Sequence, residues 1–124
     1  MTQTKNPLGS LRAGIILFTL VTAAIHLYLG FVQLSLGMMG GVMFLANAAG
    51  YVALLAMLYF NLPISFLSKN RALVRWALVA FAAVTILGWL AIGDKTLPSG
   101  LLGYVDKTIE VVLIALLIVE GRNK

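Results

Sequence analysis

Cysteine is absent from this 124-residue chain, and charged residues are scarce. The lack of cysteine excludes disulfides, zinc–thiolate sites and thiol chemistry. Only 10% of the residues are charged and 61% are hydrophobic, whereas a soluble domain carries about 25% charged residues. With a mean hydropathy of +1.02, the chain has too little polar surface to cover a body in water. The composition therefore predicts a protein that lies in a lipid bilayer.

The sequence also lacks the motifs of soluble catalysis. It has no glycine-rich phosphate loop and no serine nucleophile motif. The chain has one histidine, His26, so it lacks the two histidines four residues apart that would bind zinc from one helix. Haem ligation would need a histidine from a second chain or a methionine as the other ligand. We therefore expect no enzyme, no catalytic residues, no metal and no cofactor, with a haem or another pigment left as an open alternative. The basic residues behind the net charge of +5 lie at the ends of apolar runs, so we expect no nucleic-acid partner.

Four apolar runs are long enough to cross a bilayer as helices, which takes about 20 residues each. They cover residues 11–33, 38–60, 72–92 and 101–120. The connections between them are short. The sequence therefore predicts a single transmembrane domain over residues 1–124, an all-α integral membrane four-helix bundle.

The positions of lysine and arginine predict the direction of these spans, because positive residues concentrate on the cytoplasmic side of membrane proteins. On one predicted side there are only two of them, Lys95 and Lys107. On the other side there are seven: Lys5, Arg12, Lys69, Arg71, Arg75, Arg122 and Lys124. We therefore expect both termini to be cytoplasmic.

The fourth span carries charges near its start. A helix that began at Lys107 and ended at Glu120 would be about 21 Å long, which is short of the roughly 30 Å hydrocarbon core. We therefore expect it to begin near Leu101 and to carry its charges into the membrane. We expect Lys107 either to extend back to the interface or to pair with Glu110, three residues further along the helix. Asp106 lies either at the interface or inside the membrane, and the sequence leaves both locations open. We expect Glu110 to face the interior and interpret Glu120 as an interfacial end residue.

A shift of 63 residues aligns residues 12–54 with residues 75–117 and suggests an internal repeat. Identical residues fall at 11 of the 43 aligned positions, including an arginine pair and three glycine pairs. This is about twice the number expected from such a composition. The repeat predicts two helical hairpins that cross the membrane in the same direction, related by an axis along the membrane normal.

Polar residues of the four spans lie at a common depth. His26, Asn47, Thr85 and Glu110 each lie about seven positions inside the predicted outer end of their span, which corresponds to roughly 10 Å. We therefore predict a polar intramembrane layer that contains them together with Asp106. For His26, two interpretations stay open. It is either a neutral imidazole bonded to a neighbouring helix or part of a proton-responsive pair with Glu110 or Asp106.

The second span is rich in small residues, among them Ala46, Gly50 and Ala53. Small side chains let helix backbones approach one another in a membrane. We expect these residues to pack against the other spans of the chain. The alternative is that part of this face contacts another subunit.

Several short motifs resemble those of a group of uncharacterised small four-helix membrane proteins from prokaryotes, including haloarchaea. They are His26-Leu27, the segment Phe44–Gly50, the arginine that opens the third span, and Gly-x-x-Asp-Lys at residues 103–107. The resemblance implies a location in the prokaryotic plasma (inner) membrane. It also implies a shared pattern that includes His26, Asp106 and Lys107, and it brings no established activity.

Three functions are compatible with these features. The first is an accessory or assembly subunit of a larger, energy-converting membrane complex, whose partners are the lipid bilayer and other membrane subunits or further copies of the chain. The second is an oligomeric small-solute or proton-linked transporter or channel that uses the layer of His26, Asn47 and Glu110. The third is a membrane redox protein with a bound cofactor. We prefer them in this order.

Overall fold

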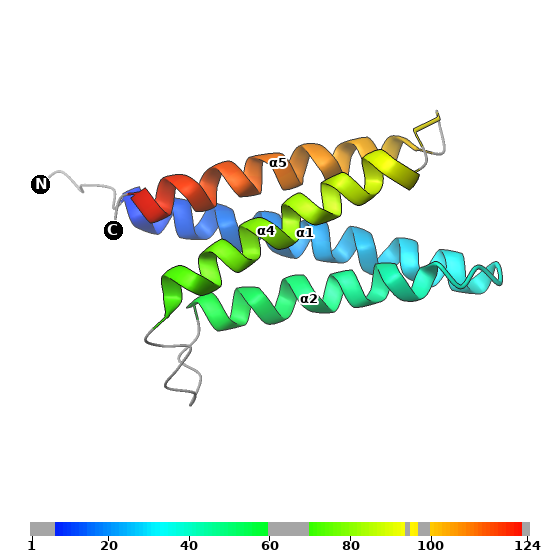
Figure 1. The fold of residues 1–124 in the computed structure, drawn as a ribbon, viewed down its shortest axis with the longest axis horizontal. Helices are drawn as coiled ribbons and strands as arrows, with labels where there is room; N and C mark the ends of the chain where they lie inside the picture. The colour runs from blue at the N-terminus through cyan, green and yellow to red at the C-terminus, as the bar shows by residue number, and fades with distance from the viewer. Residues whose placement is uncertain (1–6, 60–69, 94, 97–99, 123–124) are drawn as a thin grey trace, which may run out of the picture.

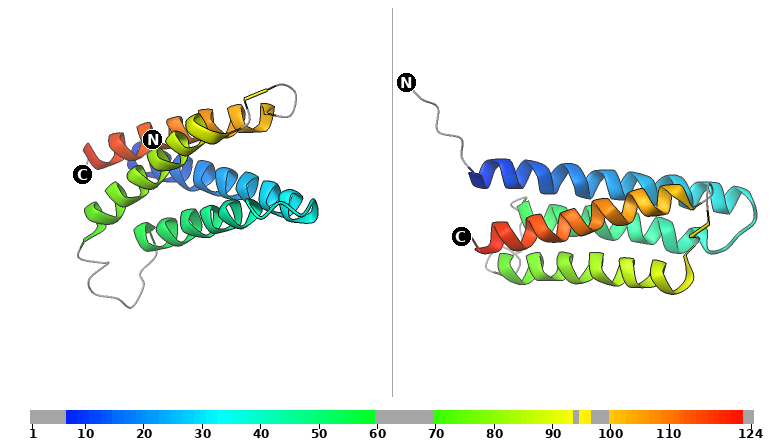
Figure 2. Two further views of the ribbon diagram at one scale, coloured as in Figure 1. Left: turned by 45° about the vertical axis from the view of Figure 1, so that its right-hand side comes forward. Right: turned by 90° about the horizontal axis from the view of Figure 1, so that it is seen from above.

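The computed structural model describes residues 7–59, 70–93, 95–96 and 100–122. These residues form four helices, α1 (Pro7–Ser35), α2 (Gly41–Tyr59), α4 (Arg71–Ile92) and α5 (Leu101–Arg122). The helices alternate in direction, so α1 begins and α5 ends at the same end of the molecule (Figure 1). Contacts of α1 with α2 and α5, and of α4 with α5 and α2, join them into an all-α four-helix bundle (Figure 2).

The observed helices follow the predicted spans, with small shifts at their ends. α1 begins four residues before Leu11, and α2 begins at Gly41 instead of residue 38 because the preceding residues form a turn. Residue 60, the predicted end of the second span, lies outside the described residues. α4 begins at Arg71, one residue early, and α5 begins at Leu101. The prediction that the last helix starts before its charges is therefore confirmed.

Glycines shape the turn between α1 and α2. Gly37 has a φ of 76°, a conformation that other residues rarely adopt, just beyond the end of α1. A Cβ atom on Gly41 would lie 2.5 Å from the carbonyl oxygen of Gly30, so the two helices approach closely here. As a result, the His26 ring of α1 lies 5.8 Å from the Phe44 ring of α2, centroid to centroid.

The buried apolar side chains concentrate toward the end where α1 begins and α5 ends. We call five of them, which come from all four helices, the apolar plug: Ile15, Leu58, Leu78, Leu113 and Leu117. Each is almost completely buried. Toward the opposite end, α4 diverges from α2 (Figure 1). The bundle is therefore tightly packed at one end and more open at the other.

Three of the helices, α1, α2 and α4, are long and apolar enough to cross a membrane. α5 is as long as α4, with 22 residues each, but it carries Asp106, Lys107 and Glu110. The outer surface of the bundle presents large apolar side chains such as Leu17 and Leu87. These properties are those of a membrane protein.

The small residues of α2 differ in their surroundings. Gly50 packs against α4, because a Cβ atom there would lie 2.5 Å from the ring of Phe81. Ala46 and Ala53 are exposed on the outer surface, so the prediction that they pack against other spans of the chain is wrong. The reason is that a different face of α2 turns toward the core, formed by Ala48, Tyr51, Leu55 and Leu58.

Candidate functional site

Three charged side chains of α5 lie inside the bundle. Asp106 is 2% exposed, Lys107 9% and Glu110 0%. Lys107 Nζ donates hydrogen bonds to Asp106 Oδ2 at 2.8 Å and to Glu110 Oε1 at 2.7 Å. The expectation that Lys107 extends to the interface is wrong, because the two buried carboxylates hold its ammonium group between them. The alternative pairing with Glu110 is confirmed.

Helix α1 adds Thr22 and His26, which lie one helical turn apart. His26 Nδ1 is 2.8 Å from the Thr22 carbonyl oxygen. A carbonyl oxygen only accepts, so Nδ1 carries the proton of this hydrogen bond. His26 Nε2 then faces Asp106 Oδ2 at 3.6 Å. The Thr22 hydroxyl donates to Asp106 Oδ1 and lies 3.3 Å from Glu110 Oε2. Of the two interpretations of His26, the geometry favours the one that pairs it with a carboxylate.

Helices α2 and α4 complete the layer. The Tyr51 hydroxyl donates to Glu110 Oε2 at 2.5 Å, across the centre of the bundle. Asn47 Nδ2 donates to Thr85 Oγ1 at 2.8 Å, and the Thr85 hydroxyl donates to the Phe81 carbonyl at 2.8 Å. The predicted layer therefore forms two groups. One contains Asn47 and Thr85, and the other contains His26, Asp106 and Glu110.

We use the name polar cluster for the group around the charges, which consists of Thr22, His26, Tyr51, Asp106, Lys107 and Glu110. The sequence did not identify Thr22 and Tyr51 as site residues. A signal for both was present, because Thr22 is four residues before His26 and Tyr51 is four residues after Asn47. Residues four apart share a helix face.

Three residues of the polar cluster could together hold a metal ion. One ligand atom each from His26, Asp106 and Glu110 lies within 4.8 Å of the others. The ligands weighed beside His26 from the sequence are a second histidine, a cysteine and a methionine. Two carboxylates of α5 are not among them, and these approach His26 because α1 and α5 pack side by side.

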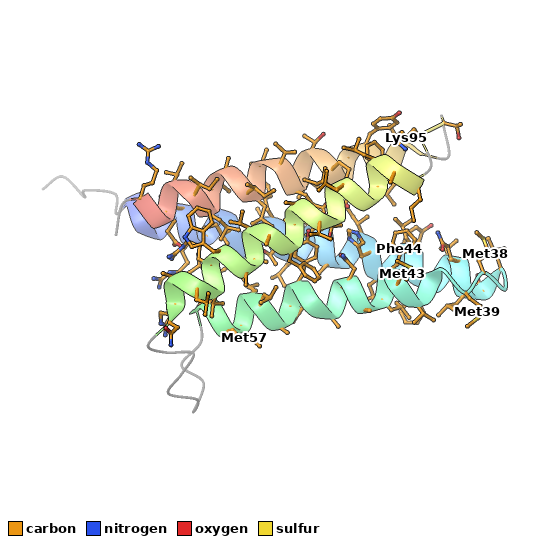
Figure 3. The ribbon with its side chains drawn as sticks, in the orientation of Figure 1. Met38, Met39, Met43, Phe44, Met57 and Lys95 are labelled. Carbon is orange, nitrogen blue, oxygen red and sulfur yellow. The ribbon has the colours of Figure 1, made fainter. Side chains whose placement is uncertain are left out.

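A cavity of about 660 Å³ lies beside the polar cluster, where α2 and α4 diverge. His26, Asp106 and Lys107 belong to its lining. Apolar residues form much of the rest, and Figure 3 shows three of these, Met38, Met43 and Phe44, at the end of the bundle away from the apolar plug. Met43 is 68% exposed, so the cavity reaches the molecular surface. Two of the charged residues, Asp106 and Lys107, therefore border a cavity that opens toward one end of the bundle.

A second ion pair lies at the other end, ten residues further along α5. Glu120 is 0% exposed and accepts hydrogen bonds from Arg75 Nη2 and from the Tyr59 hydroxyl, both at 2.9 Å. The Arg12 guanidinium stacks over the Tyr59 ring at 5.0 Å. Glu120 lies near the end of α5, as interpreted, but its carboxylate is buried by residues of α2 and α4.

No family model, curated protein or solved structure matches the chain. The resemblance to small prokaryotic membrane proteins therefore stays a prediction.

Proposed function

We propose that the protein is a membrane transporter that moves a small cation through the polar cluster. In this proposal all four helices span the plasma membrane of a prokaryote, and both termini are cytoplasmic. The apolar character of α1, α2 and α4 supports the insertion. The position of the arginines supports the orientation, because Arg12, Arg71, Arg75 and Arg122 all lie near the end where α1 begins and α5 ends.

The observation that carries this proposal is the charge of the buried cluster. Asp106 and Glu110 supply two carboxylates, whereas Lys107 supplies one ammonium group. With a neutral His26, one negative charge lacks a counter-charge. A buried charge without a partner is strongly destabilising, with a penalty of several kcal/mol. The cluster is therefore suited to take up one further cation, either a proton or a metal ion, from the cavity.

The polar cluster borders a cavity on one side and a packed apolar layer on the other, as the binding site of a carrier does. The cavity connects it to the predicted outer side of the membrane. On the predicted cytoplasmic side, the apolar plug lies between Glu110 and Glu120, ten residues or about 15 Å apart along α5. A cation cannot cross this packed layer without a rearrangement of the helices. The arrangement therefore supports alternating access rather than an open pore.

Charge movement in proteoliposomes tests the proposal. The purified protein is adsorbed on a solid-supported membrane, and concentration jumps of H⁺, Na⁺ or Zn²⁺ are applied. We expect a transient current for at least one of them. We expect Glu110→Gln to reduce this current at least tenfold, because it removes a buried charge that the cation must replace or bind.

Thr108→Val is the matched control for this experiment. Thr108 lies on α5 beside Lys107, but its side chain is exposed and bonds only to its own helix, at the Tyr104 carbonyl. The current should be unchanged. A wild-type protein without current for any of the three cations, or a Glu110→Gln variant with the full current, would contradict the proposal.

One observation favours a second function, the accessory subunit. Ala46 and Ala53 form an exposed face of small residues on α2 together with Ala49. Such a face allows close approach of another helix in a membrane. Native mass spectrometry of the gently extracted protein distinguishes the two proposals. Foreign chains in fixed stoichiometry would favour the subunit, whereas a monomer or homo-oligomer would favour the transporter.

A further inference from the structure

We propose that the polar cluster is a binding site for a divalent transition-metal ion, with His26 Nε2, Asp106 and Glu110 as ligands. In the structure, the Lys107 ammonium group occupies the position of this ion. This ion is then the cation of the proposed transport, so the biological role of the site rests on the proposed function. The binding site itself can be tested by binding alone.

The geometry of the three ligand residues fits one small ion. Their ligand atoms lie within 4.8 Å of one another, and the separation of His26 Nε2 from Asp106 Oδ2 is 3.6 Å. At metal–ligand distances of about 2.0–2.2 Å, two ligands of a tetrahedral ion are roughly 3.4 Å apart. Small side-chain rotations would therefore bring all three atoms onto a single ion. The cavity leaves a further coordination position open on the side of Asp106.

The partners of these ligands already have the arrangement that a metal site needs. The His26 Nδ1–H donates to the Thr22 carbonyl, which directs the lone pair of Nε2 toward Asp106. The Thr22 hydroxyl donates to Asp106, and the Tyr51 hydroxyl donates to Glu110. Metal-bound histidines and carboxylates are oriented by such hydrogen bonds to their outer atoms.

Lys107 acts as a tethered competitor for the metal ion in this arrangement. Its ammonium group contacts the Asp106 oxygen that also faces His26, and it contacts Glu110 at 2.7 Å. Lys107 also lines the cavity, into which its flexible side chain can rotate. With a divalent ion between Asp106 and Glu110, the charges of the ligands and the ion balance. The ammonium group alone leaves one negative charge in excess.

The ligand atoms also determine the class of ion. One imidazole nitrogen and two carboxylate oxygens suit Zn²⁺, Mn²⁺, Fe²⁺ or Co²⁺. Cu⁺ prefers sulfur ligands, and the chain has no cysteine. Mg²⁺ and Ca²⁺ prefer sites made of oxygen atoms alone.

Co²⁺ titration of the full-length protein in detergent tests the inference. The protein should carry no polyhistidine tag, so that His26 is the only histidine. We expect a visible d–d absorption band that Zn²⁺ abolishes by competition and that His26→Gln lacks. Lys107→Leu should bind Co²⁺ at least about tenfold more tightly, because it removes a competing charge. The exposed Lys95 provides the control Lys95→Leu, which should bind as the wild type does.

The outcomes are distinct. A folded Lys107→Leu protein without a band, or a band that persists in His26→Gln, overturns the metal site. If Lys107→Leu folds poorly, Zn²⁺ present during extraction should restore its thermal stability, and a failure to do so also overturns the site. Metal binding without any current would retain the site and remove the transporter. A proton current without metal binding would retain the transporter and remove the site.

Discussion

Glu110 and Glu120 are both fully buried on α5, and each accepts hydrogen bonds from one cationic side chain and one tyrosine. These partners of Glu110 are Lys107 and Tyr51, with the Thr22 hydroxyl also 3.3 Å from it, and those of Glu120 are Arg75 and Tyr59. The difference between them is Asp106, a second carboxylate that lies only beside Glu110. Glu120 has a cationic partner of its own, Arg75, so we interpret this pair as structural and the polar cluster as functional.

The structural role of the second pair leads to a prediction about stability. Arg75→Met leaves the buried Glu120 carboxylate without its cation, so we expect a loss of about 3 kcal/mol in the free energy of unfolding. The double variant Arg75→Met with Glu120→Met should recover much of this loss, because it removes both charges. Unfolding in mixed detergent micelles measures both values. If Arg75→Met is as stable as the wild type, the pair has no structural role and our interpretation is wrong.

Single residues also show how far a sequence can predict a site. The depth of Glu110 follows from its position in a span, and the interior location expected for it agrees with the structure. Glu120 lies near a helix end, where depth along the helix does not determine burial. Its carboxylate is covered by Arg75 and Tyr59, residues 45 and 61 positions away. Contacts of this kind depend on the packing of helices, which composition does not specify.

Among the helices, α2 shows how apolar content can predict a span without predicting the face that it buries. Every part of its sequence is apolar or small, with Asn47 as its one strongly polar residue, so hydropathy gives no preferred side. The face that packs inward contains Tyr51, which reaches Glu110. In α5 the sequence does indicate the buried face, because Asp106 and Glu110 share one side with the buried Leu113 and Leu117.

The contact between α2 and α4 is close at Gly50, and this leads to a further prediction. Gly50→Val places a side chain against the Phe81 ring, so we expect a destabilisation of about 1–3 kcal/mol from overpacking. Ala49→Val is the control, because Ala49 is exposed beside it. Thermal unfolding of both variants in the same detergent tests the difference. Equal melting temperatures would show that α2 and α4 do not approach at this point.

The internal repeat stays a prediction, and two hydrogen bonds are consistent with it. The 63-residue shift pairs Thr22 with Thr85 and Asn47 with Glu110. Thr22 lies 3.3 Å from Glu110, and Thr85 lies 2.8 Å from Asn47. Each threonine therefore contacts the polar residue of the other predicted hairpin. If the chain arose by duplication, its two halves now differ most in charge, because only the second half carries carboxylates in this layer.

The whole molecule is a bundle whose two ends differ. The sequence predicts its helices and the end at which the arginines gather. It does not predict the cavity, which forms because α4 diverges from α2 while α1 and α2 remain close at Gly30 and Gly41. The distribution of space inside a bundle depends on these helix angles. The proposed transport needs both features, a cavity on one side and an apolar plug on the other.

The central claim is that, in the conformation of this structure, the polar cluster is open to the outer side of the membrane, and Gly88 is the position at which to test it. Gly88 lines the cavity, and a Cβ atom there would contact nothing within 4 Å. Because the chain has no cysteine, Gly88→Cys provides a single thiol. Ala80→Cys is the control, since Ala80 is exposed near the middle of α4, where we expect lipid to prevent reaction.

A membrane-impermeant thiol reagent is added separately to the outer and the cytoplasmic side of membranes that contain each variant. We predict that Gly88→Cys reacts readily from the outer side and that Ala80→Cys reacts from neither side. Labelling of Gly88→Cys from the cytoplasmic side alone would contradict the orientation. A thiol at position 88 that is protected from both sides would contradict the open cavity, and with it the path to the polar cluster.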